Sequence, residues 1–100
     1  MDFDVRVRRL IDRENTPVKA VCSVTFGHQY AVHGVKVVET KNGRFMTMPY
    51  ETYTDAEDNA KRRDVFHPVT NEARRAMEEA VFAAYDAVKA TESTENDIED

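Results

Sequence analysis

The sequence predicts an α+β domain, in which an antiparallel meander sheet of four to five strands is packed by one long C-terminal helix. Three observations lead to this prediction. Apolar and polar residues alternate along much of the first half of the chain, which is typical of half-buried strands. The dipeptide Asn42-Gly43 is a strong hairpin signal. Apolar residues recur at clear helical spacing only between residues 70 and 89.

The first two strands are predicted over residues 4–10 and 18–26. In the first, Val5 and Val7 alternate with arginines. A polar turn over residues 12–17 follows. The second strand has the clearest alternation, and its apolar face is formed by Val18, Ala20, Cys22, Val24 and Phe26.

A third strand is predicted over residues 30–40, after a short loop over residues 27–29. Its apolar pattern slips by one residue near His33 and Gly34. Such a slip predicts a β-bulge, and glycine is a common residue at a bulge.

The fourth strand is predicted over residues 44–48, before Pro49. A type I′ turn at Asn42-Gly43 would connect it to the third strand, because this turn needs positive φ at both central residues. The pairs that this turn would set are Thr40 with Phe45 and Glu39 with Met46.

Residues 50–60 show no clear periodicity and are predicted to form a loop, and residues 63–66 a short fifth strand. Either Thr70 or Asn71 is expected to cap the helix, which should run to about Lys89. The apolar stripe of the helix consists of Ala73, Met77, Ala80, Val81, Ala84, Tyr85 and Val88.

One helix can cover only one face of such a sheet. Five apolar strand residues therefore cannot all lie beneath it: Val5, Val7, Val21, Val35 and Phe45. We expect a second copy of the chain to close the other face or an edge. A two-fold homodimer is the most common form of such a contact.

The net charge of −5 does not describe the expected domain, residues 1–89. The tail, residues 90–100, contains five acidic residues and no basic one, and leaves 14 acidic against 14 basic residues in the rest of the chain. Its polar composition predicts disorder. The tail is either a solubilising end or a mimic of nucleic acid that competes for the basic surface of the same protein.

Several classes of protein are not expected. No apolar run approaches the roughly 20 residues that cross a bilayer, and the acidic N-terminus does not resemble a signal peptide. The single cysteine, Cys22, is compatible with a cytoplasmic protein. No catalytic motif is visible, so an enzyme is not expected, nor is a cofactor. The candidate metal ligands lack a recognised zinc spacing: Cys22, His28, His33 and His67.

Basic residues gather on both sides of the expected helix start. They are Lys61, Arg62, Arg63, Arg74 and Arg75, with Arg6, Arg8 and Arg9 as an extension. Arginine in the first turn opposes the helix dipole, which points to an anionic partner such as nucleic acid phosphate. The alternative is a solvated surface in which Arg63 pairs with an acidic residue and Arg74 and Arg75 pair with glutamates one turn along the helix. Tyr50 and Tyr53 lie close by in sequence, and either stack on unpaired bases or pack on the sheet.

Several segments, taken together, resemble the stage V sporulation protein G family, the SpoVG or septation proteins. The similar segments are Val5-Arg6-Val7-Arg8-Arg9, residues 19–26 with His28 and His33, the run from Asn42 to Pro49, the junction from Arg63 to Val69, and Arg74, Ala80, Val81 and Tyr85 in the helix. After Pro49 the family usually has a basic loop with two adjacent Lys or Arg residues. This chain has Tyr50 to Asp55 there, with about four extra residues before Arg63, and Lys61 and Arg62 lie downstream.

The resemblance implies a small cytoplasmic α+β protein that forms a dimer, and a regulator of cell division, septation and sporulation that binds DNA or RNA. Our hypothesis is that two basic patches of the dimer contact one duplex. The alternative is a protein-interaction module of the division machinery, without direct contact to DNA. No membrane partner is expected.

Overall fold

The computed structural model describes residues 2–11 and 15–92. It contains six strands and one helix in its described part: β1 (Phe3–Leu10), β2 (Val18–Phe26), β3 (Tyr30–Thr40), β4 (Gly43–Thr47), β5 (Tyr50–Thr54), β6 (Ala60–Asp64) and α1 (Asn71–Glu92). The predicted α+β class is confirmed. The first part of the expected turn, residues 12–14, lies outside the described residues, as do residues 93–100 of the expected tail.

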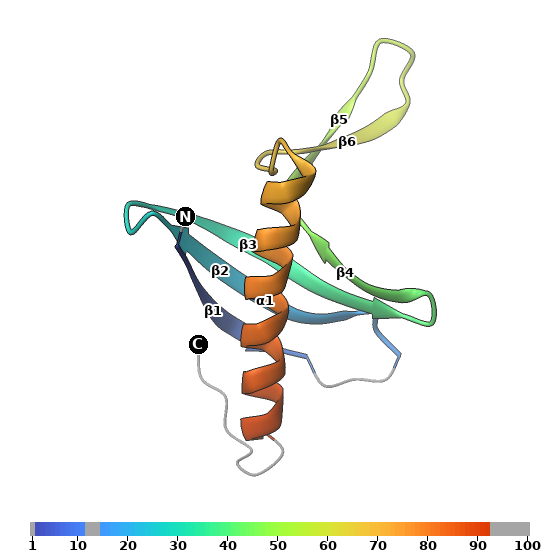
Figure 1. The fold of residues 1–100 in the computed structure, drawn as a ribbon. Coiled ribbons are helices and arrows are strands. Elements are labelled where there is room, and N and C mark those ends of the chain that lie inside the picture. The colour runs from blue at the N-terminus through green and yellow to red at the C-terminus, as the bar shows by residue number, and fades with distance from the viewer. Residues whose placement is uncertain (1, 12–14, 93–100) are drawn as a thin grey trace.

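The main sheet is an antiparallel meander in the order β1-β2-β3-β4, and α1 packs across one face of it (Figure 1). Alternation along the strands determines which residues the helix covers. Cys22, Val24 and Val35 point towards α1 and are fully buried, where they contact helix residues such as Val81 in one apolar core. The residues between them in sequence point to the opposite face, which we call the open face.

The predicted bulge is present in β3. Cys22 pairs with Val35 but Ser23 pairs with His33, so Gly34 is the extra residue. Its φ is +87°, a conformation that L residues rarely adopt. The bulge brings both Val32 and Val35 onto the helix side, where both are buried.

The predicted register of the β3–β4 hairpin is wrong. Thr40 pairs with Gly43 and Val37 with Met46, a shift of two residues from the expected pairs. The Thr40 hydroxyl accepts a hydrogen bond from the Asn42 amide at 3.1 Å, which favours a turn centred on Lys41 and Asn42. Since only Gly43 of that turn has positive φ, a type I′ turn does not form. A shift of two residues keeps every side chain on its expected face.

The prediction of a loop over residues 50–60 is also wrong. β5 and β6 pair as a separate two-stranded sheet, with Tyr50 opposite Asp64 and Thr54 opposite Ala60. The tip is tightened by Asp55, whose carboxylate accepts hydrogen bonds from the amides of Glu57 and Asn59. No apolar alternation indicated these strands, because every residue of both is exposed.

The start of α1 is fixed by Thr70, one of the two predicted caps. The Thr70 hydroxyl accepts a hydrogen bond from the Ala73 amide at 3.0 Å, which satisfies one of the unpaired donors of the first turn. His67 Nδ1 lies 3.0 Å from the Pro68 carbonyl and braces the turn before it. The helix continues beyond Lys89 to Glu92. No helix in the described part of the chain is both long and apolar enough to cross a bilayer.

Burial of Cys22 predicts a loss of stability at high pH. Burial raises the pKa of this thiol from 9.0 to about 11, because a thiolate would lose its hydration in the core. The neutral thiol therefore stabilises the fold fully below pH 9, and this contribution is lost as pH rises towards 11. We expect the wild type to lose about 2–3 kcal/mol more than Cys22→Ala over this range. Urea unfolding of both proteins between pH 8 and 11 measures the difference, and parallel pH profiles would contradict it.

Candidate nucleic-acid interface

The open face of the main sheet is basic. Arg6, Ser23 and His33 form one row across three strands, and Arg9, Val21 and Lys36 form the next. Arg8 is the extra residue of a bulge in β1 between these rows. Of the described acidic residues on the four strands, Asp4 is the one that shares this face by alternation.

A hydrogen-bond chain fixes the middle of the open face. Arg8 Nε–H donates to Ser23 Oγ at 3.2 Å, and the same oxygen lies 2.7 Å from His33 Nδ1. Ser23 is buried beneath these two side chains. These hydrogen bonds restrict the movement of the Arg8 guanidinium but leave its positive charge in place, because a serine hydroxyl carries no charge.

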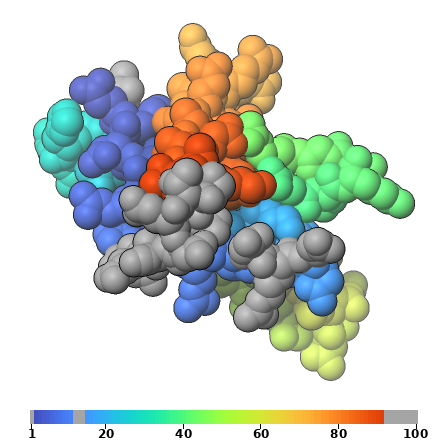
Figure 2. Space-filling model, turned by 90° about the horizontal axis from the view of Figure 1, so that it is seen from below, coloured from blue at the N-terminus to red at the C-terminus, as the bar shows by residue number. Residues whose placement is uncertain are grey.

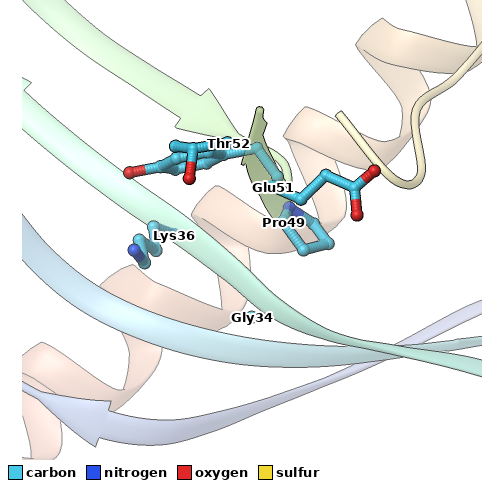
Figure 3. Close-up of a pocket in the computed structure, with 6 residues that line it drawn as sticks. Gly34, Lys36, Pro49, Glu51 and Thr52 are labelled. Atoms are coloured by element: carbon cyan, nitrogen blue, oxygen red, sulfur yellow. The ribbon is translucent and has the colours of Figure 1, made fainter. Parts of the chain in front are cut away.

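The β5–β6 hairpin extends this face into a cleft. Figure 2 shows the hairpin (yellow-green) on the opposite side of the sheet from α1 (orange to red). A cleft of about 620 Å³ lies where the hairpin leaves the sheet, and it is lined by Gly34, Lys36, Pro49, Tyr50, Glu51 and Thr52 (Figure 3).

Two cations flank the Tyr50 ring in this cleft. Arg62 lies 4.4 Å and Lys36 Nζ 5.8 Å from the ring centroid. A cation–π contact attracts a cation to the ring but leaves its positive charge in place. Tyr50 is 42% exposed, and its ring meets the main sheet at Lys36, so both roles considered for this residue, stacking on bases and packing on the sheet, stay predictions.

The hairpin separates the three basic residues that the sequence placed together. Thr52 pairs with Arg62 and Glu51 with Arg63, so Arg62 and Arg63 point to opposite faces of the hairpin. Arg63 forms an ion pair with Glu51 at 2.8 Å and lies over the Tyr53 ring, and Lys61 lies 3.9 Å from Asp55. In Figure 3, the Glu51 carboxylate points away from Lys36. Of these three basic residues, only Arg62 faces the cleft.

Arg74 and Arg75 lie elsewhere. They belong to the first turns of α1, on the other side of the sheet from the hairpin (Figure 2). Neither forms an ion pair with a described carboxylate, so the predicted pairs with Glu78 and Glu79 are not formed. The five candidate residues therefore do not make one continuous surface within a protomer.

Sequence reasoning missed Lys36 and treated the arginines of the first strand only as an extension. The signal was available in the alternation itself. Arg6 shares a face with Asp4, opposite to Val5 and Val7, and Lys36 falls between two buried valines. The role of Tyr50 could not be read in this way, because it depends on where the hairpin turns relative to the sheet.

The remaining ligand-type residues do not assemble into another centre. No three residues among His, Cys, Asp and Glu come together to hold a metal within the ranges 2–11 and 15–92. Cys22 is buried in the core, and His28 lies 3.3 Å from Asp2 at an exposed hairpin.

Comparison with known proteins identifies the family of this chain. The model of the SpoVG family matches residues 1–87. Three relatives carry the name "Putative septation protein SpoVG". The protein of Clostridium acetobutylicum is 35% identical over 97 residues, covering 97% of this chain and 96% of the relative. That of Thermoanaerobacter sp. strain X514 is 37% identical over 90 residues, covering 90% and 91%. That of Acetivibrio thermocellus is 40% identical over 85 residues, covering 85% and 84%. The match spans both the sheet and most of the helix, and the chain belongs to the SpoVG family.

Proposed function

We propose that this protein is a nucleic-acid-binding regulator with a role in septation and sporulation, and that the cleft and the open face bind the phosphate backbone. The role in septation follows the printed names of its relatives. The observation that carries the binding proposal is the set of cations on one concave side of the molecule: Arg6, Arg8, Arg9, Lys36 and Arg62.

The lack of ion pairs with described carboxylates at these cations favours binding of a polyanion. None of the five cations forms an ion pair with a described carboxylate, whereas Lys61 and Arg63 on the far face of the hairpin do. Binding of phosphate at the open face would therefore displace few existing contacts. Each phosphate that is neutralised releases counterions, which supplies affinity without sequence preference.

A homodimer would extend this surface. Val21 and Phe45 lie on the open face, and Phe45 is 46% exposed. Val5, Val7 and Val35 pack towards the helix instead. A two-fold contact through Phe45 at the β4 edge would leave Arg9 and Lys36, which flank Val21, accessible and would bring two sets of cations close together. Arg74 and Arg75 lie on the helix side of the sheet, so in such a dimer they would face away from the open face and remain candidates for a separate contact.

The test is fluorescence anisotropy with a labelled 20-nucleotide DNA, single-stranded and duplex, at several salt concentrations. We expect Lys36→Gln/Arg62→Gln to bind about tenfold more weakly at low salt, and each lost contact to lower the salt slope by about 0.7–0.9. Lys41→Gln/Lys89→Gln is the matched control for loss of two charges, because both residues are exposed, Lys41 in the β3–β4 turn and Lys89 in the last turn of α1. Unchanged binding by the double variant would remove the cleft from the proposal, and affinity independent of salt would remove phosphate binding.

A second candidate function is a protein-interaction module. It is favoured by an apolar region at the start of α1, where Val65 and Val69 are 58% and 84% exposed. An apolar cavity of about 130 Å³ is also present there, lined by Phe3, Phe26, Phe66, Pro68, Ala73 and Met77. Binding to a division protein that is lost in Val69→Asp, with no affinity for DNA, would support this function instead.

A further inference from the structure

We propose that the acidic C-terminal segment, residues 93–100, docks on the open face of the same chain along β1 and competes with polyanions there. The competition rests on the proposed nucleic-acid function, whereas the docking does not. Three features support the docking: cations of the open face that form no ion pair with a described carboxylate, the position at which α1 ends, and the charge pattern of residues 93–100.

The cations of β1 are accessible from the edge of the sheet. β1 pairs with β2 on one side only, so its other edge is free within the described part of the chain. Three arginines point from this edge strand to the open face: Arg6, Arg8 and Arg9. A segment that passes around β1 can reach all three without crossing another strand.

The end of α1 lies on the side of the sheet where β1 forms the edge. Of the four strands of the main sheet, β1 is the one that α1 contacts most extensively. Phe3 shares the apolar cavity with Ala73 and Met77, which places the first turns of α1 at the start of β1. α1 therefore runs from the start of β1 towards its end, and stops below the sheet in Figure 1.

The length of the remaining segment is sufficient. Eight residues reach at most about 26 Å when extended. Passing from the helix layer to the open face uses about 10 Å, the thickness of one packed layer. About 16 Å remain, the length of about five residues of an extended strand, and we expect this length to reach Arg9 and Arg8.

The charges of the segment complement this strand. Glu95, Asp97 and Glu99 occur at every second residue, so an extended chain would present all three to one side. The segment has no basic residue to compensate them. Attachment to α1 keeps its local concentration in the millimolar range, which makes even weak pairing effective.

The test uses the full chain with two acidic charges of the C-terminal segment removed. It measures docking first. Amide chemical shifts of the wild type and of Glu95→Gln/Asp97→Asn are compared by NMR at low salt and at about 0.5 M salt, where the screening length falls below 5 Å. We expect differences at β1 and Lys36 at low salt that disappear at high salt. No difference at these amides would overturn the docking. Differences that grow with protein concentration would also overturn it, in favour of a tail bound to a second copy.

The second measurement is the affinity for the labelled DNA used above. We expect the tail variant to bind about fivefold more tightly than wild type at low salt. Glu57→Gln/Glu79→Gln is the matched control, because it removes the same number of exposed acidic charges elsewhere. An equal gain in this control would show an effect of net charge and overturn the competition. If no variant binds DNA but the NMR differences appear, the docking stands and the proposed nucleic-acid function fails.

Discussion

Replacing Tyr85 by alanine is expected to lower the free energy of unfolding by about 3–5 kcal/mol. Tyr85 is 2% exposed and is the largest of the fully buried side chains in the described part of the chain. It fills the space between α1 and the sheet, and its removal would leave a cavity between the two layers. Because α1 is the one helix that covers this face within residues 2–11 and 15–92, no neighbouring element of this part of the chain can move in to fill the gap. Urea unfolding followed by circular dichroism measures the change.

Tyr85→Phe is the control for this prediction. It keeps the ring and removes only the hydroxyl, so we expect a loss of at most about 1 kcal/mol. Phe82→Ala provides a second comparison, because Phe82 is only partly buried and lies beneath the Arg44 guanidinium at 4.4 Å. A cost for Tyr85→Ala below that of Phe82→Ala would contradict the packing described for the core.

Replacing Gly34 by valine is expected to destabilise the domain by about 3 kcal/mol or more. The φ of +87° is costly for any residue with a Cβ, and more so for a β-branched one. A Cβ at this position would lie 3.6 Å from the Pro49 Cβ, so the two extra methyl groups of valine would press on the residue that precedes β5. We therefore expect Gly34→Val to disturb both the bulge and the base of the hairpin.

A series at this position separates the two effects. Gly34→Asn should cost least, because asparagine tolerates positive φ better than other residues with a Cβ, and Gly34→Ala should lie between asparagine and valine. Thermal unfolding gives the order of stability, and the amide shifts of β5 report on the hairpin. If alanine and valine cost the same, backbone strain alone accounts for the loss and the contact with Pro49 does not contribute.

The sequence was informative wherever one face of an element is buried. Cys22 and Val24 alternate with polar residues because a helix covers them, and the slip at Gly34 was visible because both Val32 and Val35 must reach that helix. The helix start was equally readable, since a threonine cap is a local interaction. These features depend on burial or on a few neighbouring residues.

The wrong predictions concern features that do not depend on burial of one face and therefore leave no apolar pattern in the sequence. β5 and β6 are exposed on both faces, so their pairing leaves no apolar period. The β3–β4 hairpin pairs Thr40 with Gly43, and the Asn42 amide donates to the Thr40 hydroxyl, an arrangement that the dipeptide signal did not indicate. The candidate site was predicted from proximity in sequence. However, Arg62 and Arg63 are adjacent and still point to opposite faces, whereas Arg62 and Lys36 meet at the Tyr50 ring.

The β5–β6 hairpin is isolated from the core, and this affects how its length can vary between relatives during evolution. Its strands pair only with each other, and none of their side chains enters the core. Insertions or deletions at its tip would therefore alter the reach of the arm without a cost to the stability of the body. The cleft beside Lys36 is lined by the base of the hairpin and not by its tip, so the arm can vary in length while both the fold and the cleft are kept.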